Sequence, residues 1–190
     1  LNFLQRMSGI ASDTNEYVKA IEGSQARIVD TRKTAPGHRY LDKYAVRMGG
    51  GYNHRLNLAD GILIKDNHIA AMATRNENMT DLIRRAKRDA AHTIRIEVEC
   101  DTLEQVREAV DAGADIILFD NMTAAQMREG VAICKGRALT EASGGITIEN
   151  VREVAQTGVD LLSTGSITHS VKALDISLEV TPDSTSKVLA

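Results

Sequence analysis

The sequence lacks tryptophan, and aromatic residues make up only 3% of its 190 residues. Aliphatic side chains and alanine must therefore fill the core, and a hydrophobic content of 43% is enough for one domain of this length. Scarce aromatic rings and a net charge of only −3 argue against a nucleic-acid surface, which needs stacking rings and a broad positive field. We therefore expect no nucleic-acid partner.

Long hydrophobic runs and patterned cysteines are missing as well. No run approaches the length of a membrane span and no secretory signal pattern opens the chain, so we expect no membrane association. Cys100 and Cys134 lack metal-ligand or paired spacing, which predicts reduced, buried thiols in a cytoplasmic protein. The chain opens at Leu1 without Met, and its first residues look like the middle of a protein, so we expect a missing N-terminal portion.

Positive charge is concentrated between residues 27 and 65. This stretch holds eight Lys or Arg and three acids, a local charge of +5 that leaves −8 for the remainder. A basic pocket in an otherwise acidic molecule favours a small polyanionic ligand. Gly37 and the triple glycine at 49–51 would let the backbone approach such a ligand closely.

The first 65 residues predict two helices and two strands. An apolar stripe predicts a helix over 1–22, and the β-branched run at 27–31 predicts a short strand. A turn and a glycine loop bracket a second helix around 39–47, and a second strand is expected over 61–65.

Beyond residue 65 the pattern becomes regular. Apolar, strand-like runs centre near residues 96, 118, 140 and 162, each 22 residues from the last, and amphipathic segments separate them. The clearest of these segments is 102–112, where Thr102 and Gln105 fit a capping box and Gly113 fits a C-terminal stop.

Strands that alternate with short helices at a fixed period indicate repeated βα units and a parallel sheet. The regularity favours a TIM-like barrel over an open doubly wound sheet, and no GxGxxG follows a strand. Six strands are visible, or seven if 175–180 is included, so we predict an α/β fold with an incomplete six- to seven-stranded parallel βα barrel. One barrel domain would occupy 1–190, with 1–22 as a lead-in helix and 181–190 as a tail.

The chemistry of such a barrel is expected at the C-terminal ends of its strands. Each of the six predicted strands places a polar or small residue there. In chain order these are Arg32 and Lys33, Lys65, Glu99, Asp120, Glu141 with Ser143, and Thr164 with Gly165.

Two glutamates in IEVECD (96–101) are predicted to point into the barrel, because period-2 alternation puts Glu97 and Glu99 opposite the apolar face. Buried carboxylates need cations, so each pairs either with Arg95 or a lysine, or with a metal. Asp120 would lie close enough to share a ligand with Glu99. The two would suit Mg²⁺ and equally the hydroxyls of a sugar, and this alternative stays open.

Two small loops, EASGGIT (141–147) and STGSITHS (163–170), follow successive strands. Backbone N–H groups and helix N-termini bind phosphate well, and the last loops of βα barrels often do so. We therefore predict a phosphate site at Ser143, Gly144, Gly145, Thr164 and Gly165. His68 would only orient its loop, and His169 would either cap or pack.

Seven of these motifs together closely resemble quinolinate phosphoribosyltransferase (nicotinate-nucleotide pyrophosphorylase, carboxylating). They are DTRKTAPGHR, GGGYNHRL, IKDNH, EVE, FDN, SGG and TGSITHS, in order and with family-like spacing from about Leu1 to Leu178. The resemblance implies a two-domain subunit, an N-terminal α/β sandwich and a C-terminal incomplete barrel, of which this chain looks like the barrel alone. His38 stands where the family usually has an apolar residue, a departure expected to affect only loop packing.

The resemblance also implies a reaction, in which quinolinate and phosphoribosyl pyrophosphate give nicotinate mononucleotide, pyrophosphate and CO₂ with Mg²⁺. It assigns the quinolinate carboxylates to Arg32, His54, Arg55 and Lys65. Further assignments are Lys33 to the phosphoribosyl donor, Glu99 and Asp120 to its ribose hydroxyls and Mg²⁺, and the phosphate site above to its 5′-phosphate. The catalytic set is then Lys33, Lys65, Glu99 and Asp120.

The resemblance further implies a homodimer or a higher oligomer. In the family, the N-terminal domain of one subunit covers the barrel of its neighbour and supplies an arginine to the carboxylate site.

Three other functions remain open on the sequence. A related phosphoribosyltransferase acting on another azaheterocycle would keep the phosphate loops but change the basic residues. A non-catalytic sugar-phosphate-binding barrel would need the loops but neither Glu99 nor Asp120. A phosphate-handling isomerase or an aldolase is the third, and the aldolase would need Lys65 or Lys33 as a Schiff-base amine.

Overall fold

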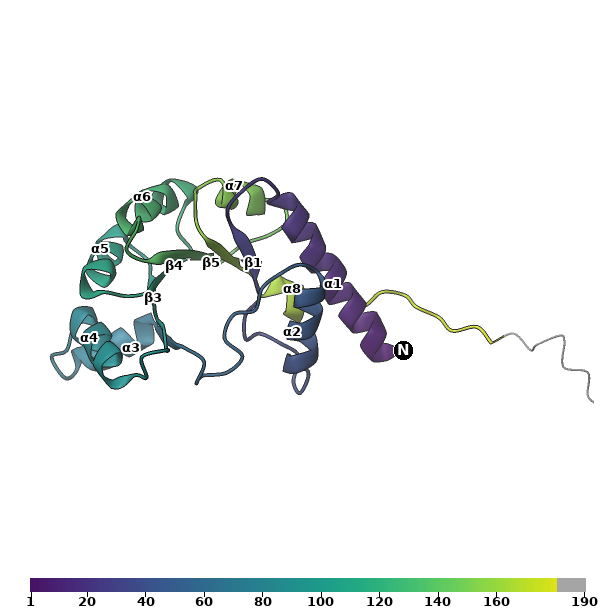
Figure 1. Cartoon of the computed structure of the whole chain (residues 1–190), viewed down its shortest axis with the longest axis horizontal. Coiled ribbons are helices and arrows are strands. Elements are labelled where there is room, and N and C mark those ends of the chain that lie inside the picture. The colour runs from purple at the N-terminus through teal and green to yellow at the C-terminus, as the bar shows by residue number, and fades with distance from the viewer. Residues whose placement is uncertain (181–190) are drawn as a thin grey trace, which may run out of the picture.

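The computed structural model describes residues 1–180, in which helices flank one curved sheet (Figure 1). The strands are β1 (Arg27–Val29), β2 (Ile62–Ile64), β3 (Ile96–Cys100), β4 (Ile116–Asp120), β5 (Leu139–Ser143) and β6 (Leu161–Ser163). The helices are α1 (Asn2–Ala20), α2 (Arg39–Met48), α3 (Asp66–Ala73), α4 (Met79–Asp89), α5 (Leu103–Ala112), α6 (Ala124–Cys134), α7 (Val151–Ala155) and α8 (Ser166–His169). None of these helices combines the length and hydropathy that a membrane crossing requires.

The six strands are all parallel and follow the order β1-β6-β5-β4-β3-β2. Within residues 1–180 no ladder joins β1 to β2, so the barrel is incomplete, as predicted. The seventh strand considered at 175–180 is not formed. The chain instead crosses α1, where the Leu174 N–H donates to the Gln5 carbonyl and the Gln5 side chain donates to the Ile176 carbonyl, both at 3.0 Å, and residues 177–180 are exposed. The proposed tail at 181–190 lies outside the described residues.

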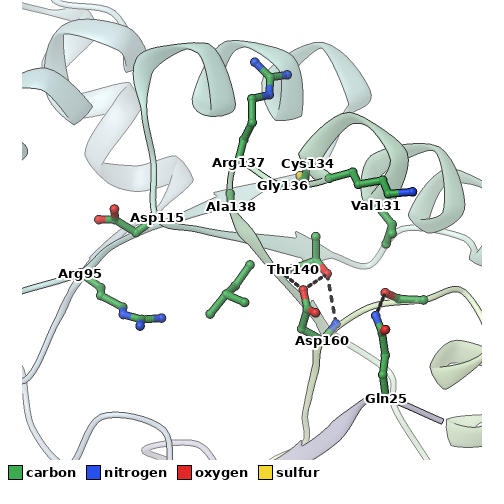
Figure 2. A pocket seen from close by; sticks show the side chains of 13 residues that line it. Gln25, Arg95, Asp115, Val131, Cys134, Gly136, Arg137, Ala138, Thr140 and Asp160 are labelled. Atoms are coloured by element: carbon green, nitrogen blue, oxygen red, sulfur yellow. Dashed lines mark hydrogen bonds between the residues drawn. The ribbon is translucent and has the colours of Figure 1, made fainter.

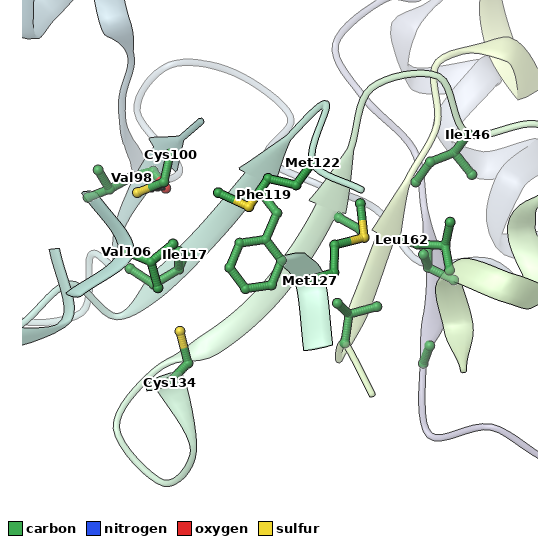
Figure 3. Packing of buried hydrophobic residues seen from close by; sticks show 14 of the residues in the cluster. Val98, Cys100, Val106, Ile117, Phe119, Met122, Met127, Cys134, Ile146 and Leu162 are labelled. Carbon is green, nitrogen blue, oxygen red and sulfur yellow. Dashed lines mark hydrogen bonds between the residues drawn. The ribbon is translucent and has the colours of Figure 1, made fainter. Parts of the chain in front are cut away.

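The outer face of the sheet packs against the helices and forms the main core (Figure 3). Ile96, Val98 and Cys100 of β3 point to this side and are at most 1% exposed. Phe119 of β4 is fully buried, and a Cβ added to Gly130 of α6 would lie 2.7 Å from its ring. A core with almost no aromatic residues thus uses one ring against a bare helix backbone.

The helices begin where the sequence predicted because their caps are local. Thr102 accepts from the Gln105 N–H and the Gln105 side chain accepts from the Thr102 N–H, which completes the capping box of α5. Gly113 ends the helix at a φ of 90°, a left-handed conformation that favours glycine. Thr123 caps α6 in the same way, so α5 and α6 both start just after the C-terminal end of a strand.

Both cysteines are buried and unpaired, as the sequence predicted. Burial raises the pKa of the Cys100 thiol to about 12 and that of Cys134 to about 11. Neither thiol is a nucleophile at neutral pH, because the reactive species is the thiolate.

Candidate active site at the C-terminal ends of the strands

A buried carboxylate at the end of β1 holds the loop that precedes β2. Asp30 is 0% exposed and accepts hydrogen bonds from Lys43 Nζ at 2.5 Å, Asn53 Nδ2 at 2.7 Å and the backbone N–H of His54 at 2.8 Å. Lys43 also donates to the His54 carbonyl at 3.0 Å. Asp30 therefore fixes the backbone from Asn53 to His54.

The His54 ring points into the barrel. Its Nε2 lies 3.1 Å from Glu97 Oε2 and 3.7 Å from Glu141 Oε1, and its Nδ1 accepts the backbone N–H of Arg55 at 2.8 Å. Burial lowers the pKa of His54, but the Glu97 hydrogen bond and the charges of Glu141 and Glu97 outweigh it and the net shift is upward. Both ring nitrogens are therefore occupied by protein groups.

Glu141 of β5 is only 1% exposed. Burial, and next the charge of Glu97, raise the pKa of its carboxyl to about 7. Among the described residues, His54, Glu97 and Glu141 are the one group of three side chains placed closely enough to hold a metal ion.

Three basic side chains lie at the rim near these groups. Arg55 Nη1 donates to the Gly61 carbonyl at 3.0 Å, and burial together with the charge of Arg32 lowers its pKa. The Arg32 Nε is buried without a hydrogen-bond partner among the described residues. Lys65, at the end of β2, forms an ion pair with Glu99 of β3. Two guanidinium groups that repel each other, one of them with an orphaned donor, favour a bidentate anion.

The predicted metal ligands lie at the ends of neighbouring strands. Glu99 Oε2 is bonded to Lys65, and Asp120 Oδ2 accepts from Asn121 Nδ2 at 2.9 Å. No hydrogen bond within residues 1–180 reaches the other oxygen of either carboxylate. Two oxygens do not make a protein cage, but they fit Mg²⁺, which keeps several waters and commonly bridges to substrate phosphates.

The glycine loops after β5 and β6 have open backbone. Gly144 has a φ of 88°, and a Cβ there would lie 2.2 Å from Asn121 Oδ1, so a side chain is excluded. The hydrogen bonds within residues 1–180 leave the backbone N–H groups of Gly144, Gly145 and Gly165 without acceptors. Ser143 is half-buried, whereas Thr164 is buried and bonds to the Ser166 hydroxyl at 2.9 Å. The two loops therefore offer unused donors.

Lys33 brings the loop after β1 to the loop after β6. Its carbonyl accepts the Thr168 hydroxyl at 2.8 Å, and its Cδ lies near Gly165, 3.1 Å from where a Cβ would stand. The Lys33 side chain is exposed, and it lies beside the predicted phosphate loop.

A large cavity lies away from these groups. A space of about 780 Å³ opens at the N-terminal ends of β4, β5 and β6 and contains none of the predicted site residues (Figure 2). Its Asp160 is already committed to the Thr140 N–H and hydroxyl at 2.8 Å. A second cavity, of about 480 Å³, lies inside the barrel and includes His54, Arg55 and Glu97 in its lining. Of these two cavities, the second alone is lined by predicted site residues.

Sequence reasoning missed the partners of the interior carboxylates. Glu97 pairs with His54, not with Arg95 or a lysine, and the buried position of Glu141 went unremarked. The signal was the lone glutamate in the strand LTEAS, whose neighbours are small or apolar. Asp30 had no signal beyond its place at the end of a strand.

The remaining histidines have local roles. His68 Nδ1 accepts the backbone N–H of Lys65 at 2.9 Å, which agrees with its predicted function in orienting the loop. His38 packs edge-on against Phe3 at 5.5 Å between ring centroids, and His169 bonds to the Ser170 hydroxyl at 2.6 Å.

Fold and site together define a class, an incomplete βα barrel with basic side chains and two carboxylates at the C-terminal ends of its strands. Comparison with known sequences identifies the family within this class. The model of the family described as "Quinolinate phosphoribosyl transferase, C-terminal domain" matches residues 10–179. The chain belongs to this family.

Known relatives agree with this assignment. The chain is 51% identical over 181 residues to the probable nicotinate-nucleotide pyrophosphorylase (carboxylating) of Bacillus subtilis, covering 95% of the chain and 61% of the relative. It is 48% identical over 183 residues to the nicotinate-nucleotide pyrophosphorylase (carboxylating) of Mycobacterium leprae, covering 95% and 63%. The crystal structure of NadC from Streptococcus pyogenes superposes with a TM-score of 0.89 at 44% identity, covering 95% and 62%. The chain thus spans less than two thirds of each.

Proposed function

We propose that this domain carries the phosphoribosyl-transfer site of a quinolinate phosphoribosyltransferase, a pentosyltransferase of NAD biosynthesis. Quinolinate and phosphoribosyl pyrophosphate would give nicotinate mononucleotide, pyrophosphate and CO₂. The observation that carries the proposal is the gathering of cations, carboxylates and open glycine backbone at one rim. It is supported by membership of the family and by the names of the relatives.

The basic residues would bind the two carboxylates of quinolinate. Arg32 and Arg55 offer planar forks that match a carboxylate, and Lys65 offers an ammonium that the substrate would share with Glu99. Because burial and mutual repulsion destabilise the charged guanidinium of Arg55, an incoming dianion would relieve the repulsion between the two arginines. His54 belongs to this predicted set as well, and its ring lies between Glu97 and the Arg55 backbone N–H.

The other half of the rim would bind the phosphoribosyl donor. Gly144, Gly145 and Gly165 have free N–H groups for the 5′-phosphate, beside Ser143 and Thr164. Glu99 and Asp120 would hold the ribose hydroxyls and Mg²⁺, and Lys33 would face the pyrophosphate. When bound, Mg²⁺ would neutralise charge on the leaving pyrophosphate.

The chemistry would need no nucleophilic side chain. The pyridine nitrogen would attack the anomeric carbon as pyrophosphate leaves, with positive charge developing on the ribose. Glu99 and Asp120 would offset that charge, and Lys33 would offset the negative charge of the leaving group. When the 2-carboxylate then departs as CO₂, its bonding electron pair stays on C2 beside the cationic ring nitrogen, which stabilises it. A proton from solvent takes the place of the carboxylate, so the step needs positioning more than a side-chain acid or base.

The proposal extends to the assembly and the compartment. We infer a cytoplasmic homodimer, or a higher oligomer, in which a neighbouring subunit completes the carboxylate site. The 190-residue chain alone would then turn over slowly.

Turnover of the longer protein tests the activity directly. Quinolinate, phosphoribosyl pyrophosphate and Mg²⁺ would be supplied to a subunit that contains this domain, and CO₂ and nicotinate mononucleotide would be followed together. We expect equal release of both products. Binding of the phosphoribosyl donor without either product would refute the acceptor, and the search would move to other azaheterocycles.

Two substitutions should divide the site into its halves. Arg32→Ala removes a charge-assisted pair worth about 1.5–3 kcal/mol, so the KM for quinolinate should rise about 10–100-fold while the KM for the phosphoribosyl donor stays unchanged. Glu99→Gln keeps a partner for Lys65 but removes the charge, so kcat should fall instead. Arg84→Ala, on the outer helix α4, is the matched control. Equal effects of Arg32→Ala on both substrates would contradict this division.

A further inference from the structure

Two asparagines hold the glycine loop that follows β5. Asn121 directly follows β4 and Asn150 directly precedes α7, so two different elements reach the loop. Ile146 anchors the same loop, because its side chain is only 6% exposed and its carbonyl accepts the Thr164 hydroxyl at 3.3 Å. The loop is therefore tied to its surroundings at several points.

Asn121 has a left-handed backbone conformation, with a φ of 52°. Asparagine tolerates this region better than most residues with a side chain, because its short amide can bond locally. Its backbone N–H donates to the Ser143 carbonyl at 3.1 Å, just past the last paired residues of β4 and β5. Its Nδ2 donates to Asp120 Oδ2 at 2.9 Å, and a Cβ on Gly144 would lie 2.2 Å from its Oδ1. One side chain thus contacts both the Asp120 carboxylate and the glycine loop.

Asn150 bonds to the next glycine of the loop. Its Nδ2 donates to the Gly145 carbonyl at 2.8 Å, and its Oδ1 accepts the Thr147 N–H at 2.9 Å. The bond to Thr147 is one half of a capping box, which any helix start could use. The bond to Gly145 has no part in capping, because it fixes a carbonyl that lies before the helical turn. Asn150 therefore acts on the loop as well as on the helix.

These contacts leave the donors of the loop free. The backbone N–H groups of Gly144 and Gly145 have no acceptor within residues 1–180, and the φ values of the two residues are 88° and 61°. Successive N–H groups in such turns form concave sites for anions. Donors that are already held in place bind an anion more tightly, because less conformational entropy is lost on binding.

We propose that Asn121 and Asn150 are positioning residues that preorganise the N–H donors of Gly144 and Gly145 for the 5′-phosphate of a phosphoribosyl group. Asn121 in addition fixes this loop relative to Asp120, which would hold the ribose hydroxyls, so that phosphate and ribose are recognised as one unit. Neither asparagine needs to contact the ligand. The identity of the ligand rests on the proposed function.

Calorimetric binding of ribose 5-phosphate to a subunit that contains this domain tests the two roles. Asn121→Gly removes the side chain but keeps a residue that accepts a φ of 52°, and Asn150→Ala removes both side-chain bonds. Each variant should raise the dissociation constant about 3–10-fold, the effect of losing about one ordinary hydrogen bond. In turnover, the KM for phosphoribosyl pyrophosphate should rise by the same factor while the KM for quinolinate stays unchanged.

Asp81→Ala, on the outer helix α4, is the control for a purely structural role. Asp81 accepts the Asn78 N–H at 3.2 Å in a capping box, so this variant loses a helix-start bond of the kind that Asn150 also makes. It should lower the free energy of unfolding and leave the dissociation constant of ribose 5-phosphate unchanged. An unchanged dissociation constant in either asparagine variant would overturn the proposal, and so would an equal rise of the two KM values.

The outcome for the proposed function is separate. A wild type that binds ribose 5-phosphate, binds it more weakly in both variants and yet releases no nicotinate mononucleotide would refute the reaction and leave the role of the asparagines standing. Release of the product with wild-type dissociation constants in both variants would refute that role alone. A wild type that does not bind ribose 5-phosphate would overturn the role as well. Should one variant fail to fold, the other decides, because the two asparagines act on different glycines.

Discussion

Replacing Asp30 by alanine is expected to lower the free energy of unfolding by about 3–5 kcal/mol, among the largest effects of any single substitution in this domain. The variant would leave the Lys43 ammonium buried without its carboxylate, and it would strip the acceptor from Asn53 Nδ2 and from the His54 N–H. Urea unfolding of wild type and variant gives the difference directly.

A second substitution separates the lost ion pair from a general loss of packing. Asp30→Ala with Lys43→Met removes both charges, so a large part of the stability should return. Asp111→Ala is the matched control, because its bond to Arg137 lies on the surface and should be worth less than about 1 kcal/mol. A double variant no more stable than Asp30→Ala would show that Lys43 was not the source of the cost.

Stability should also fall with rising pH through Glu141. Its carboxyl has an ordinary pKa of 4.5 when unfolded and about 7 in the folded chain, so the folded state binds more protons between these values. The contribution is full below pH 4.5 and is lost as the pH rises through 7, a decrease of about 3 kcal/mol. Glu141→Gln has no proton to lose. The difference between its unfolding free energy and that of the wild type should therefore shift in favour of the variant by about 3 kcal/mol as the pH rises from 4.5 through 7.

The comparison requires unfolding curves of both proteins at several pH values from about 4.5 to about 8. Glu104→Gln is the control, since its side chain is 82% exposed, and its stability should run parallel to that of the wild type. Parallel curves for Glu141→Gln as well would mean that Glu141 ionises normally in the folded chain.

The fold was predictable because its determinants are local. The capping box at Thr102 and Gln105 and the stop at Gly113 each depend on residues that are near in sequence. The apolar runs recur every 22 residues, which is visible in the sequence alone. The parallel sheet follows from their alternation, and the structure confirms six strands in an incomplete barrel. The segment at 175–180 was ambiguous because a short apolar run does not reveal whether it meets a sheet or, as here, a helix.

The site was predictable only in outline. The ends of parallel strands share a rim, so Lys65, Glu99 and Asp120 could be expected near one another, although their roles remain predictions. The interior pairs could not be read from the sequence, because His54 meets Glu97 and Glu141 from 43 and 87 residues away and a one-residue change of register would reverse each side chain. The contact of His54 Nδ1 with the Arg55 backbone N–H likewise exists only in the folded loop.

The strand order has a consequence for how the chain is made. β1, the first of these six strands to leave the ribosome, pairs with β6, through Arg27 and Leu161, across 134 residues. β2 to β5 pair with their neighbours in sequence and can form a sheet as they emerge. During synthesis the ladder of β1 must therefore wait for the last strand, although Asp30 can already meet Lys43, Asn53 and His54. The binding rim would then be among the last parts of the domain to be assembled.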